Sequence, residues 1–379
     1  MTPRFLPFNR PFLSGREFEY MRQAADDAHL AGDGPFTRRC HQWLEQHVGC
    51  RRALLTHSCT AALEMTALLA DIAPGDEIIM PSYTFVSTAN AFVLRGASPV
   101  FVDIRPDTLN LDDSLVEAAI TPRTRAVVPV HYAGVACEMD AITVIASDHG
   151  LLVIEDAAQA FGATYRRQPL GCLGQLAATS FHETKNIVCG EGGALFVNDP
   201  EYTAKAEIIR EKGTDRSRFL RGQVDKYSWV DVGSSFLPGE LSAAFLWAQM
   251  EHAGEITEAR LQIWNWYYER SEHLEANGQL RRPVVPSHCG HNAHMFYVLL
   301  ANLDTRTRVL GGLNAQGVNA VFHYVPLHSS AGGVRFGRAA GSMRHTDNIS
   351  QRLVRLPLWV GMEQADVDRV ITCLEQLLN

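Results

Sequence analysis

The sequence lacks features that mark several functional classes, beginning with an excess of positive charge. Of its 379 residues, 34 are Lys or Arg and 42 are Asp or Glu, so the formal net charge is -8. No global positive field therefore recruits nucleic acid or an anionic membrane surface. Any anionic ligand must be held by a local site.

Long apolar runs are also missing. No stretch approaches the roughly 18–20 apolar residues that span a bilayer. Prolines at positions 3, 7 and 11 interrupt the first residues, which hold no apolar run suited to a signal peptide. We therefore expect a soluble, cytoplasmic protein with no membrane-spanning segment.

The sequence also lacks two short motifs, one typical of zinc and redox sites and one typical of nicotinamide-cofactor sites. The eight cysteines include no C-x-x-C pair, which indicates scattered, reduced thiols rather than disulfides or a zinc site, and no metal ligands are expected. A nicotinamide-dependent dehydrogenase would carry G-x-G-x-x-G after its first strand. The sequence has no such stretch, which argues against that class.

The length and composition, by contrast, are sufficient for two hydrophobic cores. At 379 residues, 46% of them hydrophobic, the chain exceeds the size at which single cores usually divide into domains. We expect a large domain over residues 1–250 and a smaller C-terminal α+β domain over residues 251–379.

Between about residues 50 and 200, segments typical of helices alternate with short apolar segments typical of strands. One such strand, 151–155, is an almost continuous apolar run, as in strands covered on both faces. The alternation predicts an α/β domain with a mostly parallel sheet and helices on both faces. The expected helices are 58–70, 84–94, 112–120 and 139–148, and the expected strands are 77–80, 99–103, 126–131, 151–155 and 176–179.

The C-terminal third has a different pattern. It predicts one or two long helices over 240–276, whose aromatic residues suit a core or an interface better than a cofactor site. Strand-like segments follow at 294–300 and 319–325, and a helix over 364–377 ends the chain.

Three short segments carry side chains suited to one kind of chemistry. The first, Ser58-Cys59-Thr60-Ala61, begins an expected helix. Helix N-termini expose free N–H groups and a partial positive charge, which suit a phosphate. Ser58 could instead be an ordinary N-cap.

The second segment, Glu155-Asp156-Ala157-Ala158-Gln159, follows a buried strand. Open α/β sheets bind ligands at the carboxyl ends of their strands, so Asp156 could hold a protonated pyridine nitrogen there. Gln159 could reach the 3-oxygen of the same ring. Alternatively, Asp156 caps the following helix. The sequence alone does not distinguish this capping role from a role in binding the ring nitrogen.

The third segment, 180–186, follows strand 176–179 and contains Lys185. A lysine forms Schiff bases with carbonyl compounds when burial or nearby positive charge lowers its pKa. A lysine in a polar loop is usually a solvated surface residue. Lys185, however, lies about one strand–loop–strand unit after Asp156, at the same expected rim of the sheet.

With these segments in this order, the sequence resembles the DegT/DnrJ/StrS family of sugar-nucleotide aminotransferases, which have pyridoxal-phosphate fold type I. The resemblance spans nearly the whole chain, from about residue 6 to the C-terminus. The matching stretches are GDG at 32–34, PSYTFVSTAN at 81–90, VHYAGVACEMD at 130–140, SFHETKN at 180–186, REKGT at 210–214 and QVDKY at 223–227.

The resemblance implies pyridoxal 5′-phosphate (PLP) as the cofactor and assigns roles to single residues. Lys185 would form the Schiff base with it, Asp156 would pair with the ring nitrogen and Gln159 would contact the 3-oxygen. The aromatic ring of Phe85 would stack on the cofactor. The cradle for the phosphate would comprise Cys59, Thr60 and Ser180.

The resemblance also implies a homodimer with shared active sites. Many family members carry a Gly-aromatic-Asn-aromatic-Arg stretch that reaches the phosphate in the neighbouring subunit. Here the stretch reads Gly233-Ser234-Ser235-Phe236-Leu237. Ser235 can still donate one hydrogen bond to that cofactor, whereas Leu237 can donate none.

The implied reaction moves an amino group from L-glutamate, which leaves as 2-oxoglutarate, to the 4-keto carbon of a dTDP-linked 6-deoxyhexose. Lys185 would be both nucleophile and general base. Arg218 and Arg221, in the basic segment 210–226, are candidates for the diphosphate, although a solvated loop would have the same composition. The candidates for the sugar, each of which could instead be structural, are His131, His182, His323 and His328.

Three alternatives share the cofactor. A different nucleotide-sugar aminotransferase, acting at another sugar position or with other stereochemistry, would use the same residues. In PLP-dependent sugar dehydratases a histidine typically replaces the lysine, so Lys185 argues against that activity. A regulator or sensor that merely binds PLP stays open at this point.

Overall fold

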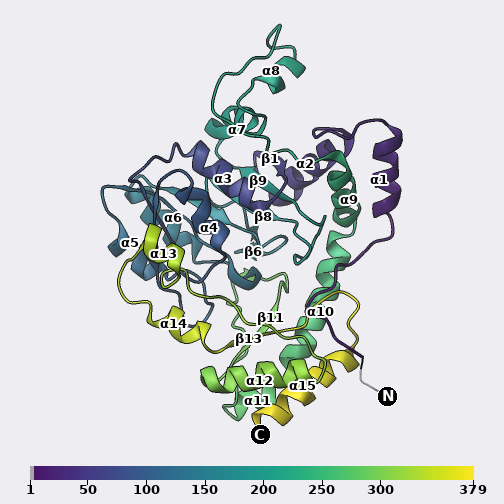
Figure 1. The fold of residues 1–379 in the computed structure, drawn as a ribbon, viewed down its shortest axis with the longest axis vertical. Coiled ribbons are helices and arrows are strands. Elements are labelled where there is room, and N and C mark those ends of the chain that lie inside the picture. Colours follow the sequence, from purple (N-terminus) through teal and green to yellow (C-terminus); the bar gives the residue numbers. More distant parts are fainter. Residues whose placement is uncertain (1–3) are drawn as a thin grey trace.

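A central sheet of eight strands lies within residues 4–379, the part of the chain that the computed structural model describes (Figure 1). Five pairs of neighbours are parallel, and only β9 runs antiparallel, to both β1 and β8. The expected mostly parallel sheet is confirmed. The strand order is β1 (Arg52–Thr56), β9 (Gly193–Val197), β8 (Leu176–Ser180), β5 (Leu152–Asp156), β4 (Thr124–Val127), β2 (Glu77–Pro81), β3 (Ser98–Val102) and β12 (Arg338–Ala339).

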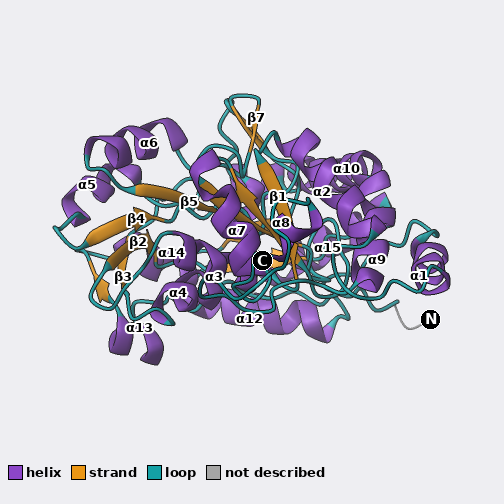
Figure 2. Cartoon of the chain, turned by 90° about the horizontal axis from the view of Figure 1, so that it is seen from above, coloured by secondary structure: helices purple, strands orange, loops and turns teal. Residues whose placement is uncertain are grey.

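Helices cover both faces of this sheet (Figure 2). Successive side chains of a strand point to opposite faces, so Ile78 and Met80 pack into a core with helices α3 and α4, whereas Ile79 packs into another core with α6. The expected segment 112–120 forms a 3₁₀ turn and one helical turn. The covering helices are α3 (Cys59–Leu69), α4 (Val86–Val93), α5 (Val116–Ala119), α6 (Met139–Asp148) and α7 (Thr203–Arg210).

A second hydrophobic core lies among the C-terminal elements. Helix α10 (Ala253–Arg270) joins the two regions, because Ile256 packs into the core around α9 and α2, while Ile263 and Tyr267 pack into the C-terminal core. The division of the chain at residue 250 remains our proposal. The C-terminal core contains α11 (Glu272–Ala276), β11 (Phe296–Leu299), α12 (Leu303–Ala315), β13 (Leu353–Leu356) and α15 (Gln364–Leu378).

The expected strand over 319–325 is wrong. Val321 makes a single bridge to Arg355, and the rings of His323 and Tyr324 then stack on one another with centroids 3.8 Å apart. Adjacent side chains of a strand point to opposite faces, so stacked neighbours require an irregular backbone. The segment instead places the rings of His323 and Tyr324 in the wall of a cavity, described below.

The remaining elements include α2 and α9, which form a core of their own with part of the sheet. No helix in the described part of the chain is both long and apolar enough to span a membrane. Helix α8 stands away from the body of the molecule, at the top of Figure 1. The bounds of the remaining elements are α1 (Glu17–Asp26), α2 (Pro35–Val48), β6 (Thr164–Tyr165), β7 (Gln168–Pro169), α8 (Arg216–Leu220), α9 (Glu240–Glu251), β10 (Cys289–Gly290), α13 (Ala331–Phe336) and α14 (Arg344–Ser350).

Candidate active site

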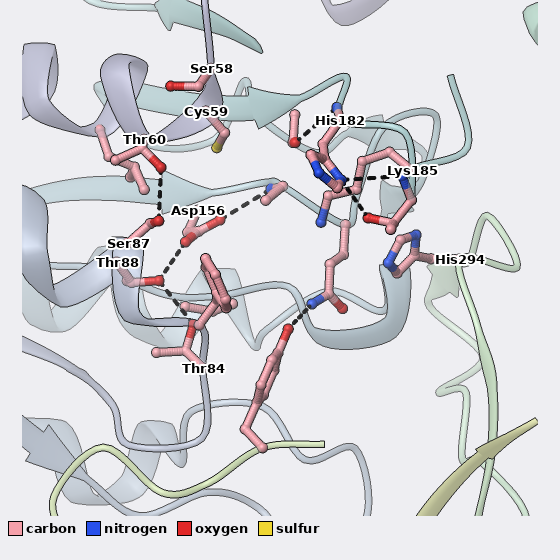
Figure 3. Close-up of a pocket in the computed structure, with 18 of the residues that line it drawn as sticks. Ser58, Cys59, Thr60, Thr84, Ser87, Thr88, Asp156, His182, Lys185 and His294 are labelled. Carbon is pink, nitrogen blue, oxygen red and sulfur yellow. Dashed lines mark hydrogen bonds between the residues drawn. The ribbon is translucent and has the colours of Figure 1, made fainter. Parts of the chain in front are cut away.

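A cavity of about 600 Å³ opens at the carboxyl ends of β5 and β8 (Figure 3). Asp156 is the last residue of β5 and Ser180 the last of β8, which is the rim where parallel sheets bind ligands. The structure brings together there most of the side chains that the sequence predicted. Those that line the cavity are Cys59, Thr60, Phe85, Asp156, Gln159, Ser180, His182, Lys185 and His323.

The N-terminus of α3 forms one wall. Ser58 caps the helix by accepting a hydrogen bond from the Ala61 N–H at 3.1 Å, so the capping role holds. The Cys59 and Thr60 N–H groups precede the first intrahelical bond and stay available for an anion. A side chain at Gly193 would lie 2.5 Å from the Cys59 nitrogen, which means that glycine keeps this cradle open.

Asp156 is held in one orientation. Its Oδ2 accepts a hydrogen bond from Thr88 Oγ1 at 2.7 Å, and its Oδ1 accepts one from the Ala158 N–H at 3.1 Å. Thr84 Oγ1 lies 2.9 Å from Thr88 Oγ1 and extends this chain of hydroxyls. Asp156 therefore stabilises the turn that follows β5 and also presents a carboxylate to the cavity.

Lys185 reaches the cavity from the loop after β8. Its backbone N–H donates to the His182 carbonyl at 2.9 Å, which folds the loop back toward the strand end. Burial lowers the pKa of Lys185 below its usual value of 10.5, against the opposing effects of Cys59 and Asp156. A lowered pKa raises the fraction of free amine, the form that attacks a carbonyl carbon.

Gln159 joins the large sheet to the C-terminal elements. Its Oε1 accepts from the Ala133 N–H at 2.7 Å, and its Nε2 donates to Tyr324 Oη at 2.9 Å. The second hydrogen of Nε2 is left for a ligand oxygen. Phe85 is 58% exposed, with its ring centroid 6.5 Å from that of Tyr324, so it presents a free aromatic face at the mouth.

The prediction that His131 binds substrate is wrong for this cavity. His131 is fully buried and lies outside the lining. Its Nδ1 accepts from the Cys137 N–H at 3.2 Å, so its Nε2 carries the proton and donates to Glu155 Oε2 at 2.9 Å. Both ring nitrogens are thus used within the protein.

Four other predicted residues lie outside the cavity of this single chain. His328 Nδ1 lies 2.7 Å from Ser82 Oγ, and its Nε2 faces Asp347. Arg221 forms an ion pair with Glu207 at 2.8 Å. Arg218 and Ser235 are exposed. The diphosphate role of Arg218 and Arg221, and the contact of Ser235 with the cofactor of a partner subunit, remain predictions.

Several lining residues were not identified from the sequence. Thr84 and Thr88 stand four residues apart after β2, in a stretch that carried the family resemblance, and this spacing was the available signal. His294, Tyr324 and Arg355 come from the C-terminal region. Nothing in their local sequence indicates that they meet Lys185.

The lining residues fit PLP. The helix terminus with Thr60 and Ser180 suits its phosphate, Asp156 its ring nitrogen, Phe85 its ring face and Lys185 its aldehyde. In residues 4–379 no group of three or more His, Cys, Asp or Glu side chains is arranged to hold a metal ion.

Comparisons with known proteins agree with this geometry. GDP-perosamine synthase of Caulobacter vibrioides is 35% identical over 97% of both chains. The crystal structure of the aminotransferase TlmJ from Streptoalloteichus hindustanus is 27% identical, covers 99% of both chains and superposes with a TM-score of 0.90. DesV of S. venezuelae, solved in complex with a ketimine intermediate, is 29% identical, covers 100% of this chain and 99% of its own, and has a TM-score of 0.89.

A family model gives the same assignment. It matches residues 12–375, nearly the whole chain. The expected fold class and PLP cofactor are thereby confirmed, and the chain belongs to the DegT/DnrJ/EryC1/StrS aminotransferase family.

Proposed function

We propose that this aminotransferase moves an amino group from L-glutamate to the 4-keto carbon of dTDP-4-dehydro-6-deoxy-D-glucose. The products would be 2-oxoglutarate and dTDP-4-amino-4,6-dideoxy-D-galactose. Such a sugar nucleotide would serve the synthesis of a surface polysaccharide such as enterobacterial common antigen. The proposal includes a homodimer whose subunits share their active sites.

The observation that carries amino transfer is the meeting of Lys185 and Asp156 in one cavity beside the N-terminus of α3. When bound there, PLP supplies an aldehyde that takes up the amino group and a ring that accepts electrons from the reacting carbon. Asp156 would keep the ring nitrogen protonated, and the N–H groups of Cys59 and Thr60 would hold the phosphate.

Lys185 would carry the proton in both halves of the reaction. Burial lowers its pKa, which raises the fraction of free amine, the form whose Nζ can accept a proton from the α-carbon of the amino donor. The same nitrogen would return a proton to C4 of the sugar. The cavity walls, formed by Phe85, Tyr324 and neighbouring side chains, limit the access of water to these carbons.

A second candidate differs in the nucleotide. The relative GDP-perosamine synthase is 35% identical, and its name indicates a GDP-linked amino sugar. This chain could therefore use a GDP-linked 4-keto sugar with the same residues.

The homodimer is supported by exposed apolar side chains near α8. Trp229 is 79% exposed, Val232 57% and Leu220 64%. Apolar side chains gathered in one segment of a surface mark interaction sites. A partner bound there would also meet Arg218, Arg221 and Ser235, which are exposed and do not line the cavity of their own chain.

The test is an amino-transfer assay with the purified holoenzyme. L-Glutamate would be supplied with a panel of dTDP- and GDP-linked keto sugars, and the configuration at C4 of each product would be determined by NMR. We expect turnover with dTDP-4-dehydro-6-deoxy-D-glucose and an axial amino group. Faster turnover of a GDP sugar would favour the second candidate, and cofactor absorbance that glutamate does not change would favour a sensor.

A further inference from the structure

Arg355 is a buried cation in the wall of the active-site cavity. It lies in β13, a strand of the C-terminal core, and is 7% exposed. Its guanidinium stands over the ring of Phe8, with 4.6 Å between the guanidinium carbon and the ring centroid. Both residues line the same cavity as Lys185.

No carboxylate compensates this charge. Among the ion pairs of residues 4–379, none includes Arg355. Burial lowers the pKa of Arg355, against the opposing effects of the hydroxyls of Tyr132, Tyr324 and Tyr83. Its Nε is buried without a hydrogen-bond partner. The guanidinium is therefore electrostatically incomplete in the protein alone.

Within residues 4–379, the one side chain that hydrogen-bonds to Arg355 is a neutral histidine, His323. Arg355 Nη1 donates to His323 Nε2 at 2.6 Å, which leaves the proton of His323 on Nδ1, 3.4 Å from the Tyr132 hydroxyl. Burial, together with the charges of Arg355 and Lys185, lowers the pKa of His323. A neutral acceptor orients the guanidinium without neutralising it, so the charge stays available to a ligand.

The surroundings of Arg355 differ from those of a second buried arginine, Arg260. Arg260 also has no acidic partner, but its Nε and Nη2 donate to the backbone carbonyls of Ala293 and His294 at 3.1 and 2.8 Å. Those hydrogen bonds connect α10 to the segment 293–294. Arg260 does not line the cavity that contains Lys185. Arg355 has no comparable set of carbonyl partners for its guanidinium.

A buried charge without a counter-ion destabilises a fold, which suggests that a ligand supplies the counter-ion. We propose that Arg355, oriented by His323, binds a carboxylate of the amino donor. This inference rests on the proposed amino transfer and adds a donor subsite to it. Guanidinium and carboxylate match as a planar, doubly hydrogen-bonded pair.

The position of Arg355 favours the donor over the other anions of the reaction. The cofactor phosphate has its own cradle at the N-terminus of α3. The diphosphate of the sugar substrate is joined to C1 of the hexose, several bonds from C4, where Lys185 acts. The α-carboxylate of glutamate, by contrast, is bonded to the carbon that reacts. Arg355 lines the same cavity as Lys185, and its charge adds to the larger effect of burial in lowering the pKa of Lys185.

Glutarate, a dicarboxylate without an amino group, is the probe for the experiment, with its binding to the holoenzyme measured by calorimetry. In R355M, which keeps most of the side-chain volume, we expect the affinity to fall on the order of 100-fold, as for other buried charge pairs. R355K keeps the charge but loses the planar, doubly hydrogen-bonded geometry, so its affinity should fall less than that of R355M without reaching that of the wild type. R352M is the matched control, since Arg352 lies three residues away, outside the cavity, and hydrogen-bonds to the Leu300 carbonyl and Asn348.

Thermal unfolding gives a second readout that a packing role would not produce. Because R355M removes an uncompensated buried charge, its Tm without ligand should equal or exceed that of the wild type. Glutarate should then raise the Tm of the wild type and of R352M but not of R355M.

Three results would overturn the proposal. The first is a wild type that does not bind glutarate, or an R355M variant that binds it equally well. The second is an R355M variant that loses affinity for dTDP instead. The third is an equal loss in R355K and R355M with a lowered Tm in both, which would indicate a packing defect. Glutarate binding that depends on Arg355 in an enzyme without keto-sugar turnover would contradict the proposed function alone.

Discussion

Thr88 Oγ1 donates a 2.7 Å hydrogen bond to Asp156 Oδ2, and both side chains are buried at the rim of the sheet. The two residues are far apart in the sequence and belong to α4 and β5. Asp156 Oδ1 accepts only from the Ala158 N–H within the described residues, and Asp156 lines the cavity. Asp156 is thus preoriented for a ring nitrogen before any cofactor binds.

The substitution T88V tests this preorientation, because valine has the shape of threonine without the hydroxyl. A hydrogen bond to a charged group contributes about 1.5–3 kcal/mol, so we expect PLP to dissociate from T88V roughly tenfold more readily, as measured by equilibrium dialysis. T66V is the control, since Thr66 Oγ1 bonds the Leu63 carbonyl within α3. An unchanged dissociation constant in T88V would show that the contact does not position Asp156.

Lys185 should be indispensable for turnover but not for binding the cofactor. General acid–base catalysis typically contributes ~10²–10⁴-fold to a rate, and we expect at least this loss in K185A. The visible absorbance of the lysine-linked cofactor should disappear, while dialysis still detects bound PLP. Wild-type rates of amino transfer in K185A would refute the assignment.

The lowered pKa of Lys185 has a consequence for the stability of the apoenzyme. At pH values between this lowered pKa and 10.5, the unfolded chain binds a proton at position 185 more strongly than the folded chain does. Stability therefore rises with pH in this window. The free energy of unfolding of wild type minus that of K185M, from urea titrations at several pH values, should increase toward pH 10.5; a flat difference would contradict a buried amine.

His131 should act through stability rather than through substrate binding. The Glu155 carboxylate accepts hydrogen bonds from His131 and from the N–H groups of Gly171, Leu173 and Gly174. A hydrogen bond to a charged group contributes about 1.5–3 kcal/mol. We expect H131F to lower the Tm by several degrees while the KM for the sugar nucleotide stays unchanged, and a selective rise in this KM would restore a substrate role.

Trp229 should stabilise the proposed dimer. We expect W229E to sediment as a monomer at concentrations where the wild type is a dimer, because the introduced charge would have to be buried in the interface. V144E is the matched control, since Val144 is 59% exposed on α6, in a different part of the surface. A dimeric W229E variant would place the interface elsewhere.

Much of the large domain could be predicted from local patterns. Helix 139–148 was predicted with the bounds it has in the structure, and Ser58 caps α3 as its position suggested. Apolar strands that end in Asp156 and Ser180 locate the rim of the sheet. Such features follow from hydrogen bonding and periodicity within a few residues, which explains why the segments from Ser58 to Lys185 were identified.

The rest depended on contacts that have no local signal. His131 and His323 were equal candidates in the sequence, yet one is buried against Glu155 and the other meets Arg355 in the cavity. Thr88, Tyr324 and Arg355 reach the site only because a parallel sheet and a second core place distant segments together. The sequence by itself determined the chemistry near Lys185, whereas the tertiary structure decided which polar groups are neutralised within the protein and which remain free for a ligand.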